Sequence, residues 1–313
     1  MSDPSIEILH VGSASRDLTD GDPRGWRLGG GVTYAALTTA RLGLRTAALV
    51  GADATAAAAA ELDLLRQAGV ALRVVPLAES PVFRNVEAAG GRIQTCLAPG
   101  HPLPAVDLPA EWRAATAWSF VPIAGEVGDA WAPAVPGQAL LALGWQGWLR
   151  DLVAGRAVRR RAPEPLALLR RADLVGVSRH DLAPRTRLGD LRLLIRPEAG
   201  LLVTDGVRGG RFVRRDADGV VRGLSYEAIP PDTEIDPTGA GDTLLGALLA
   251  AFVRPSIVGD GGLAVELDLA FAAAAASLVI ERPGLLGVPD RAAVLERGRR
   301  GQPGRLAPTS TDD

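Results

Sequence analysis

Residues 236–242 read Asp-Pro-Thr-Gly-Ala-Gly-Asp and are followed at once by the apolar run 243–252. This run is long enough to form a buried helix, and the first amides of such a helix have no partner within it and carry partial positive charge. Gly239 and Gly241 have no side chains, so an anion could approach the backbone closely, with Asp242 beside it in the first turn. The stretch therefore predicts half of a phosphate site with a carboxylate attached.

The segments around this stretch alternate between helical and extended patterns. Apolar residues recur at helical spacing over 31–43, which ends at a glycine, and a second helical segment is expected over 56–69. Short apolar runs predict strands at 46–51, 72–77, 115–121, 139–145, 172–178 and 200–205. Strands separated by helices indicate parallel β-α-β units, so we expect an α/β sandwich with a mainly parallel sheet.

Five regions depart from this alternation. Residues 11–30 and 80–97 are polar and Gly-rich and predict small antiparallel strands that form a lid, and exposed strand edges of this kind could pair two subunits into a homodimer. An Asp-Gly turn predicts a hairpin over 211–225. The Arg-rich connector 158–171 is expected to be solvated, and the tail 301–313 is expected to be disordered.

Composition excludes several classes of function. The 313 residues include a single cysteine, Cys96, which rules out an intrachain disulfide and a Cys-rich metal site. A net charge of −2 gives no global attraction to nucleic acid, and the absence of a long apolar run or a basic leader predicts a cytoplasmic protein away from membranes. All 34 basic residues are arginine, so a Walker-A loop, a protein kinase site and a pyridoxal-phosphate site are excluded.

The motif Asp236–Asp242 resembles the C-terminal signature of the pfkB/ribokinase family of carbohydrate kinases, usually D-T-T-G-A-G-D, and departs from it at Pro237. The resemblance runs through the chain from VGSASRD to RPGLLGVPDRAAV. It implies a ribokinase-like three-layer α/β/α sandwich with a small β lid, formed by residues 1–300. It also implies an ATP-dependent kinase in which Gly239, Ala240 and Gly241 form the anion hole and Asp242 is the general base. Such a helix terminus can stabilise phosphoryl transfer without a lysine.

The resemblance also implies a nucleotide site and a magnesium site. Thr204–Gly209 fits the family's T-x-G-x-x-G nucleotide loop, and Phe271–Gly284 resembles the wall of the adenine pocket. Ser178 and Asp181 stand where the family has N-x-x-E, which orders water around Mg²⁺; Asp keeps the carboxylate with a shorter reach. The residues expected to bind ATP are Thr204, Gly206, Gly209, Thr238, Ala275 and Gly284.

The N-terminal motif Gly29–Tyr34 matches the family's G-G-x-x-x-N with Tyr34 in place of Asn. In that pattern Asp17 grips substrate hydroxyls, and two carboxylate oxygens suit the vicinal diol of a sugar or polyol. The aromatic residue and the Ser-x-x-Asp motif are more similar to the plant inositol kinase branch, as is Gln146–Arg150, to which no role is assigned. The expected substrate-binding residues are Asp17, Gly30, Gly31, Tyr34, Asn85 and Arg92.

Two other functions remain open from the sequence. A nucleoside kinase of the adenosine kinase type shares the fold and the Asp, but only 4% of the residues are aromatic and available to stack a second base. A non-catalytic ligand-binding protein of the same fold is favoured by the altered N-x-x-E and Asn positions, while the intact Gly-Ala-Gly-Asp argues against it. The identity of the sugar, cyclitol or nucleoside, and of the hydroxyl phosphorylated, stays open.

Overall fold

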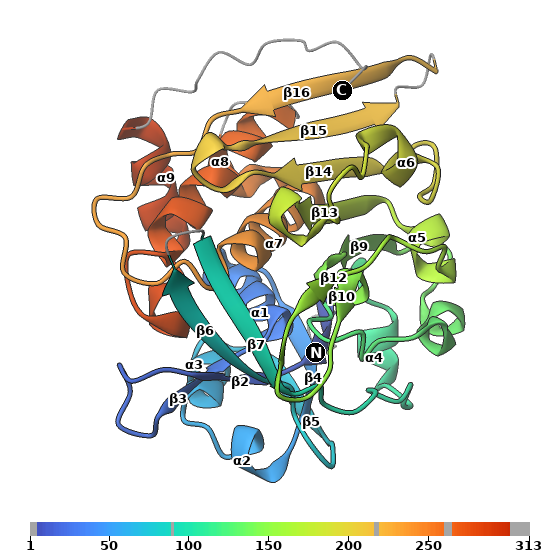
Figure 1. The fold of residues 1–313 in the computed structure, drawn as a ribbon. Coiled ribbons are helices and arrows are strands. Elements are labelled where there is room, and N and C mark those ends of the chain that lie inside the picture. The colour runs from blue at the N-terminus through green and yellow to red at the C-terminus, as the bar shows by residue number, and fades with distance from the viewer. Residues whose placement is uncertain (1–4, 89–90, 216–218, 260–264, 301–313) are drawn as a thin grey trace.

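The computed structural model describes residues 5–88, 91–215, 219–259 and 265–300 (Figure 1). In these ranges the main sheet has nine strands in the order β16-β15-β14-β13-β9-β8-β1-β4-β5, and its strands from β14 to β5 pair in parallel. The antiparallel strands β15 and β16 form the expected hairpin at one edge. The bounds are Ile8–Ser13 (β1), Thr46–Ala52 (β4), Ala71–Pro76 (β5), Ala117–Phe120 (β8), Leu140–Gly144 (β9), Leu174–Ser178 (β13), Gly200–Thr204 (β14), Gly210–Arg215 (β15) and Val221–Tyr226 (β16).

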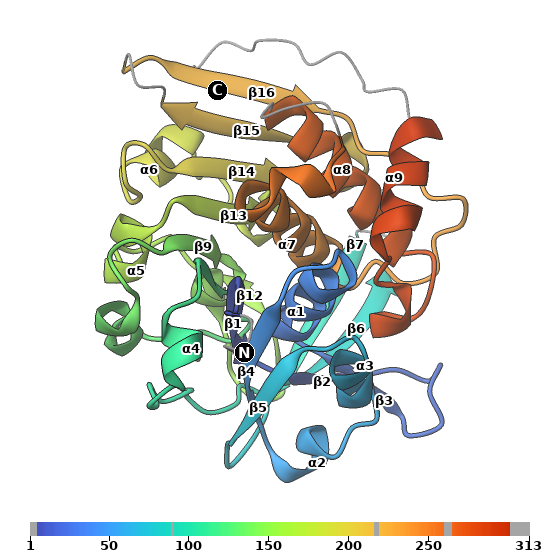
Figure 2. The same cartoon turned by 180° about the vertical axis from the view of Figure 1, so that it is seen from behind.

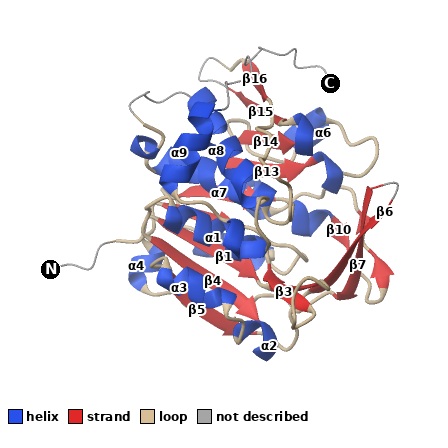
Figure 3. Ribbon diagram, turned by 90° about the vertical axis from the view of Figure 1, so that its left-hand side faces the viewer, coloured by secondary structure: helices blue, strands red, loops and turns tan. Residues whose placement is uncertain are grey.

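Helices cover both faces of this sheet, as the side view in Figure 3 and the rear view in Figure 2 show. One face carries α1 (Gly31–Arg41), α2 (Ala54–Ala57), α3 (Glu61–Gln67), α7 (Ala240–Val253), α8 (Val265–Val279) and α9 (Arg291–Arg300). The other face carries the shorter helices α4 (Ala110–Arg113), α5 (Ala167–Arg171) and α6 (Leu188–Arg192). The predicted α/β sandwich with a mainly parallel sheet is therefore confirmed.

The central strands and α7 are apolar because they are covered on all sides. Every residue of β1 and of β4 is buried, as expected for parallel strands with helices on both faces. Helix α7 buries residues 243–251 without a polar stripe, because it packs between the sheet, α1 and α8. Its N-terminus is thereby held at the edge where the parallel strands end.

A second sheet stands beside the main one and draws on three distant segments of the chain. Its order is β11-β7-β6-β2-β3, with bounds Ser15–Leu18 (β2), Trp26–Gly29 (β3), Val82–Ala88 (β6), Gly91–Ala98 (β7) and Arg156–Ala157 (β11). Both regions expected to form a lid contribute strands, although β2 and β6 pair in parallel. The strand β11 comes from a connector in which β10 (Arg150–Asp151) and β12 (Arg159–Arg160) also pair.

Two expectations about element bounds were wrong. Residues 11–13 belong to β1 at the centre of the main sheet, where the polar side chain of His10 is also buried and its Nε2 lies 3.0 Å from Thr39 Oγ1. The helix expected over 56–69 is divided into α2 and α3 by residues 58–60, and α2 begins earlier than expected, because the carboxylate of Asp53 caps it by accepting from the Ala56 amide at 2.8 Å.

The tail 301–313, expected to be disordered, lies outside the described residues. Within the described ranges, no helix combines the length and the apolar character needed to cross a membrane.

Candidate active site

The N-terminus of α7 is built by a glycine in a left-handed conformation. Gly239 is the N-cap with φ 82°, and a Cβ added there would lie 2.2 Å from Cδ1 of Tyr34, so only glycine fits. The first α-helical bond runs from the Thr243 amide to the Gly239 carbonyl at 2.8 Å, so the amides of Gly241 and Asp242 precede it. Gly241 is exposed, and a Cβ there would meet no described atom within 4 Å, so the first turn of α7 is open on this side.

The carboxylate of Asp242 lies directly against the glycine motif of α1. A Cβ added at Gly31 would lie 2.7 Å from Asp242 Oδ1 and 2.9 Å from the Val121 carbonyl oxygen, so the absence of a side chain at Gly31 makes room for the acid. The pKa of Asp242 is raised to about 7, mainly by burial. The charge of Arg150 lowers this pKa, and the charge of Asp181 raises it. A carboxylate with a pKa near neutral pH has the proton affinity expected of a general base.

Gly30, which precedes this contact, is the N-cap of α1. Its φ is 104°, and a Cβ there would lie 2.4 Å from the Ser13 carbonyl oxygen. Gly30 is thus required because the backbone of Ser13 approaches it closely, and Gly31 is required because Asp242 occupies the space of a side chain.

Asp17 and Tyr34 approach the same space from the second sheet and from α1. A Cβ at Gly29 would lie 2.3 Å from Asp17 Oδ2, and Ser15 Oγ donates to Asp17 Oδ1 at 3.1 Å. Asp17 pairs in register with Phe83, whose ring is buried on the inner side of the sheet. The Tyr34 side chain is 2% exposed, and its pKa is raised by burial and then by the carboxylates of Asp236, Asp17 and Asp242.

The structure therefore brings Asp17, Tyr34 and Asp242 together. The ring of Tyr34 packs under the Gly239 turn, and its role toward a substrate stays a prediction.

The Ser-x-x-Asp motif follows β13 in a 3₁₀ turn, Arg179–Asp181. Ser178 Oγ accepts from the His180 amide at 3.1 Å, which caps this turn. Both carboxylate oxygens of Asp181 accept from Gln146 Nε2, at 3.3 and 3.2 Å, and Arg150 Nη2 lies 3.5 Å from Oδ1. Gln146 and Arg150 belong to the motif that sequence reasoning left without a role, and they contact the acid expected at the magnesium site.

The expected nucleotide loop follows β14. Gly206 and Gly209 have φ 55° and 83°, and the Asp205 amide donates to the Gly209 carbonyl at 2.7 Å. Thr204 is the last residue of β14. A cavity of about 300 Å³ adjoins the loop, and its lining residues include Arg179, Arg208 and Arg211 together with the acidic residues Asp205 and Glu227. Phosphate groups of a donor would find positive charge here, although Arg208 also pairs with Asp205 at 2.7 Å.

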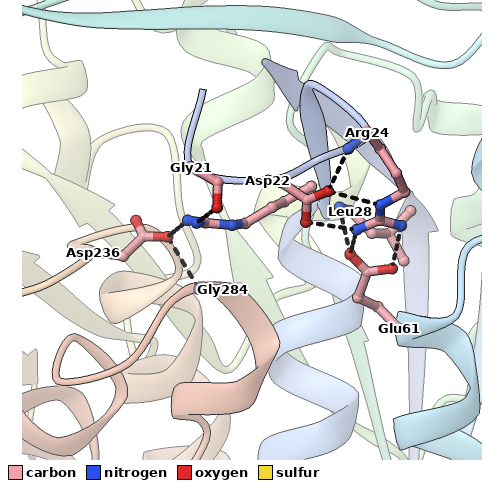
Figure 4. A network of polar contacts seen from close by, with 8 residues as sticks. Gly21, Asp22, Arg24, Leu28, Glu61, Asp236 and Gly284 are labelled. Carbon is pink, nitrogen blue, oxygen red and sulfur yellow. Dashed lines mark hydrogen bonds and ion pairs between the residues drawn. The ribbon is translucent and has the colours of Figure 1, made fainter. Parts of the chain in front are cut away.

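Asp236 joins the signature loop to two other parts of the chain. Its Oδ1 accepts from the Thr238 amide at 3.0 Å. Its Oδ2 accepts from the Gly284 amide at 3.0 Å, as Figure 4 shows. Arg27 of β3 reaches the same Oδ2 at 3.4 Å and donates to the Gly21 carbonyl at 2.9 Å. A cavity of about 430 Å³ adjoins this contact between β3, α3 and the turn Gly284–Gly287.

Ala275 differs from the other residues expected at the nucleotide site. It is fully buried in the core, so the structure does not bring it to the surface of the cavity. The roles of Thr238, Ala275 and Gly284 toward ATP stay predictions.

Asn85 and Arg92 lie on β6 and β7 of the second sheet. Asn85 shares the face of Phe83, and its Oδ1 accepts from Gln94 Nε2 at 3.0 Å. The side chain of Arg92 lies outside the described part of the chain, so its expected contact with substrate stays a prediction.

The donor groups fit a magnesium ion only in part. Among the residues that the structure describes, no group of three or more His, Cys, Asp or Glu side chains is arranged to hold a metal. Asp181 offers one carboxylate, already engaged by Gln146 and Arg150. Because Mg²⁺ is commonly held by one or two carboxylates together with water and substrate phosphates, this set fits a metal bound mainly through a phosphate donor.

Sequence reasoning missed Glu126 as well as Gln146 and Arg150. Glu126 is 4% exposed, and its carboxylate accepts from the amides of Ser13 at 3.0 Å, Ile123 at 3.1 Å and Ala124 at 2.8 Å. It thus fixes the ends of β1 and β8 beside the site. Its partner Ser13 lies 113 positions away in the sequence, so no local signal identifies it.

Comparison with known proteins supports the resemblance drawn from these motifs. Residues 166–291 match the model described as pfkB family carbohydrate kinase, a range that contains Asp181, the nucleotide loop and Asp242. Fructokinase-1 of Zea mays is 32% identical over 139 residues, which cover 42% of this chain. The match spans about two fifths, 41%, of that relative's length.

Solved structures of the ribokinase family share the fold over nearly the whole chain. A pyrophosphate-dependent kinase, complexed with a pyrophosphate analog and myo-inositol, has a TM-score of 0.67 at 20% identity and covers 92% of this chain and 98% of its own. Arabidopsis thaliana ribokinase, complexed with ribose and ATP, has a TM-score of 0.66 at 21% identity and covers 94% and 99%. A Methanocaldococcus jannaschii nucleoside kinase has a TM-score of 0.67 at 18% identity and covers 95% and 99%. The ribokinase-like fold is thereby confirmed.

Proposed function

Because the chain carries, in residues 166–291, a pfkB family carbohydrate kinase domain, we propose that it is an ATP-dependent kinase that phosphorylates one hydroxyl of a sugar or cyclitol. Residues 1–300 act as one kinase domain, and the second sheet is its lid. The phosphoryl group passes from the donor to a substrate oxygen at the N-terminus of α7.

One observation carries this proposal: the carboxylate of Asp242 lies beside the open amides of α7 and against Gly31. In this arrangement Asp242 takes the proton of the attacking hydroxyl, and the amides of Gly239, Ala240 and Gly241 donate to the oxygens of the transferring group. A positioned base and preorganised donors are the two main contributions a protein makes to phosphoryl transfer. The raised pKa of Asp242 supports the role of base, since the same carboxylate can bind and release a proton near neutral pH.

We propose a polyol as the acceptor, because the carboxylate of Asp17 in the second sheet can accept hydrogen bonds from neighbouring hydroxyls. Asp17 lies on the same side of the second sheet as Phe83, and its field reaches Tyr34, as does that of Asp242. Two oxygens of Asp17 can accept from neighbouring hydroxyls of one ring while a third hydroxyl faces Asp242. We therefore propose Asp17, Gly30, Gly31, Tyr34, Asn85 and Arg92 as the acceptor site, with a cyclitol of the inositol type as the first candidate.

The donor is ATP, bound along Thr204–Gly209 with its phosphates near the arginine-lined cavity. Thr238 and Gly284 are proposed as its further contacts, whereas the fully buried Ala275 is not. Mg²⁺, held by the donor phosphates and on the protein side by Asp181 with Ser178, supplies charge neutralisation when bound. Because one neighbour of this fold is a pyrophosphate-dependent kinase, pyrophosphate is the alternative donor to be compared with ATP.

The test is a substrate panel with purified protein. Sugars, inositols and nucleosides are each offered with ATP or with pyrophosphate, and the phosphorylated product is detected by mass spectrometry. We expect turnover with a sugar or inositol and ATP, and none with Asp242→Asn. Turnover with nucleosides alone would identify a nucleoside kinase. Tight binding of a panel compound without turnover under any donor would identify a non-catalytic binding protein.

A further inference from the structure

Phosphoryl transfer requires positive charge beside the transferring group, and in this chain the side chains with a permanent positive charge are all arginines. No lysine is present, and all 34 basic side chains are arginine. In the described ranges, Arg150 is the cation whose charge lowers the pKa of Asp242 against the effect of burial. The question is whether Arg150 only holds its neighbours in place or also acts on the phosphoryl group.

The position of Arg150 follows from the sheet topology. It comes directly after the 3₁₀ turn Gln146–Leu149, which follows β9, whereas Asp181 ends the turn that follows the neighbouring strand β13. Leu245 of α7 packs over both strands, because a Cβ at Gly176 would lie 3.2 Å from its Cδ1 and one at Gly144 3.7 Å from its Cδ2. Asp242 lies one helical turn earlier on α7, so it meets Arg150 and Asp181 at the carboxyl ends of these strands.

Contacts on three sides fix the guanidinium of Arg150. Nη1 donates to the Ile123 carbonyl at 3.1 Å, Nη2 lies 3.5 Å from Asp181 Oδ1, and the guanidinium carbon lies 5.7 Å from the centre of the Phe83 ring. The side chain is 10% exposed. A guanidinium has five N–H donors in one plane, so these anchors leave donors for a further oxyanion.

We propose that Arg150 is a catalytic residue, which donates hydrogen bonds to an oxygen of the transferring phosphoryl group and stabilises the charge that spreads over it. This role rests on the proposed kinase function. A fixed cation in a water-poor site is already oriented before the reaction, which is the condition for strong electrostatic catalysis. Gln146 is a positioning residue, because its Nε2 donates to both carboxylate oxygens of Asp181.

The balance of the step leaves Arg150 protonated throughout. The substrate hydroxyl gives its proton to the Asp242 carboxylate, and its oxygen forms the new bond to the γ-phosphorus of the donor. The bond from that phosphorus to the bridging oxygen breaks, and its electron pair leaves with ADP. Arg150 only donates hydrogen bonds along this path.

The experiment removes the guanidinium and then returns it. We expect Arg150→Ala to lower kcat by about 10²–10³-fold, the range found when one preorganised donor is removed from an active site, with a much smaller change in the KM for ATP. Guanidinium chloride, added well below denaturing concentrations, should restore part of the lost kcat by occupying the vacated position. The kcat of Arg150→Lys should lie between those of the wild type and Arg150→Ala, since an ammonium keeps the charge and loses the planar donor set.

Arg171→Ala is the matched control. Arg171 is also a half-buried arginine held by backbone carbonyls, with Nη2 2.8 Å from the Pro136 oxygen and 2.8 Å from the Ala139 oxygen, but it does not act on Asp242. Arg171→Ala should lower the melting temperature, and guanidinium should not change the kcat per folded molecule of this variant.

The result can overturn the proposal without touching the kinase function. If wild-type protein turns over a panel substrate and Arg150→Ala keeps kcat within a few fold, Arg150 is structural. A loss of kcat that guanidinium leaves unchanged would also make Arg150 structural. If wild-type protein phosphorylates nothing in the panel, the proposed function itself fails.

Discussion

Replacing Asp242 by asparagine should stop turnover and stabilise the fold at the same time. The substitution keeps the shape of the side chain and removes the proton acceptor, so kcat should fall by about 10²–10⁴-fold, the usual contribution of a general base. The gain in stability follows from the raised pKa of Asp242, about 7 in the folded protein against an ordinary value of 3.8. This difference is about three pKa units, and each unit corresponds to about 1.4 kcal/mol.

The stability gain depends on pH with a defined sign. The unfolded chain releases the proton of Asp242 above about pH 4, whereas the folded protein holds it up to about pH 7, so ionisation destabilises the fold progressively over that window. The difference of about three units sets an upper limit of ~4 kcal/mol, and because the side chain keeps some contact with water we expect ~2 kcal/mol above pH 7. For a chain of this length that is a rise in melting temperature of ~3 °C.

The assay compares thermal melts of wild type and Asp242→Asn from pH 4 to pH 9. The difference in melting temperature should grow up to about pH 7 and then stay constant, and the kcat of the wild type should rise over the same range. A difference that is constant over the whole range, or a variant less stable than wild type at pH 8, would refute the account of Asp242 as a buried, ionising base. ATP binding measured by calorimetry should survive the substitution.

Three further predictions concern neighbouring features. Gly31→Ala should lower kcat at least tenfold in a folded protein, because the new Cβ would lie 2.7 Å from Asp242 Oδ1; unchanged kcat would contradict the contact. Glu126→Ala should lower the unfolding free energy in urea by about 3 kcal/mol, since buried amides lose their acceptor, whereas a change below 1 kcal/mol would make the carboxylate dispensable. Val86 and Ile93 form an exposed cross-strand pair, each 51% exposed, and if the lid sheets pair two subunits, charged residues at both positions should give a monomer in sedimentation; a dimer that persists would place the interface elsewhere.

The sequence predicted the main sheet because its strands are apolar runs between glycines and helical segments. Strands β4, β5, β8, β9, β13 and β14 lie where these runs indicated. Strand β1 was missed because it contains His10 and Ser13, and these polar groups are buried against partners far along the chain, namely Thr39 and Glu126. The start of α2 at Ala54 was missed for a related reason, since its cap Asp53 is held by Ser80 of a distant loop.

Some residues of the candidate site could be predicted from local sequence, and others could not. The signature 236–242 and the glycines at 29–31 could be recognised because backbone geometry at a helix start leaves a local sequence pattern. Nothing local indicates that Arg150 meets Asp181, or that the ring of Tyr34 packs under Gly239, because these contacts depend on which strands become neighbours. Position along the sheet, and not spacing along the chain, determines them.

The second sheet has a consequence for the order in which the molecule folds. Its strands come from residues 15–29, 82–98 and 156–157, so long stretches of the main sheet separate them. Pairing two of these strands closes a long loop of chain, and the entropy lost in that closure is offset only once the intervening strands are in place. Contacts between residues so far apart in the sequence form slowly. We therefore expect these amides to gain protection from hydrogen exchange last during refolding and to lose it first in the native state. The part of the protein proposed to cover the substrate would then also be its least cooperative unit, able to open while the nine-stranded sheet stays intact.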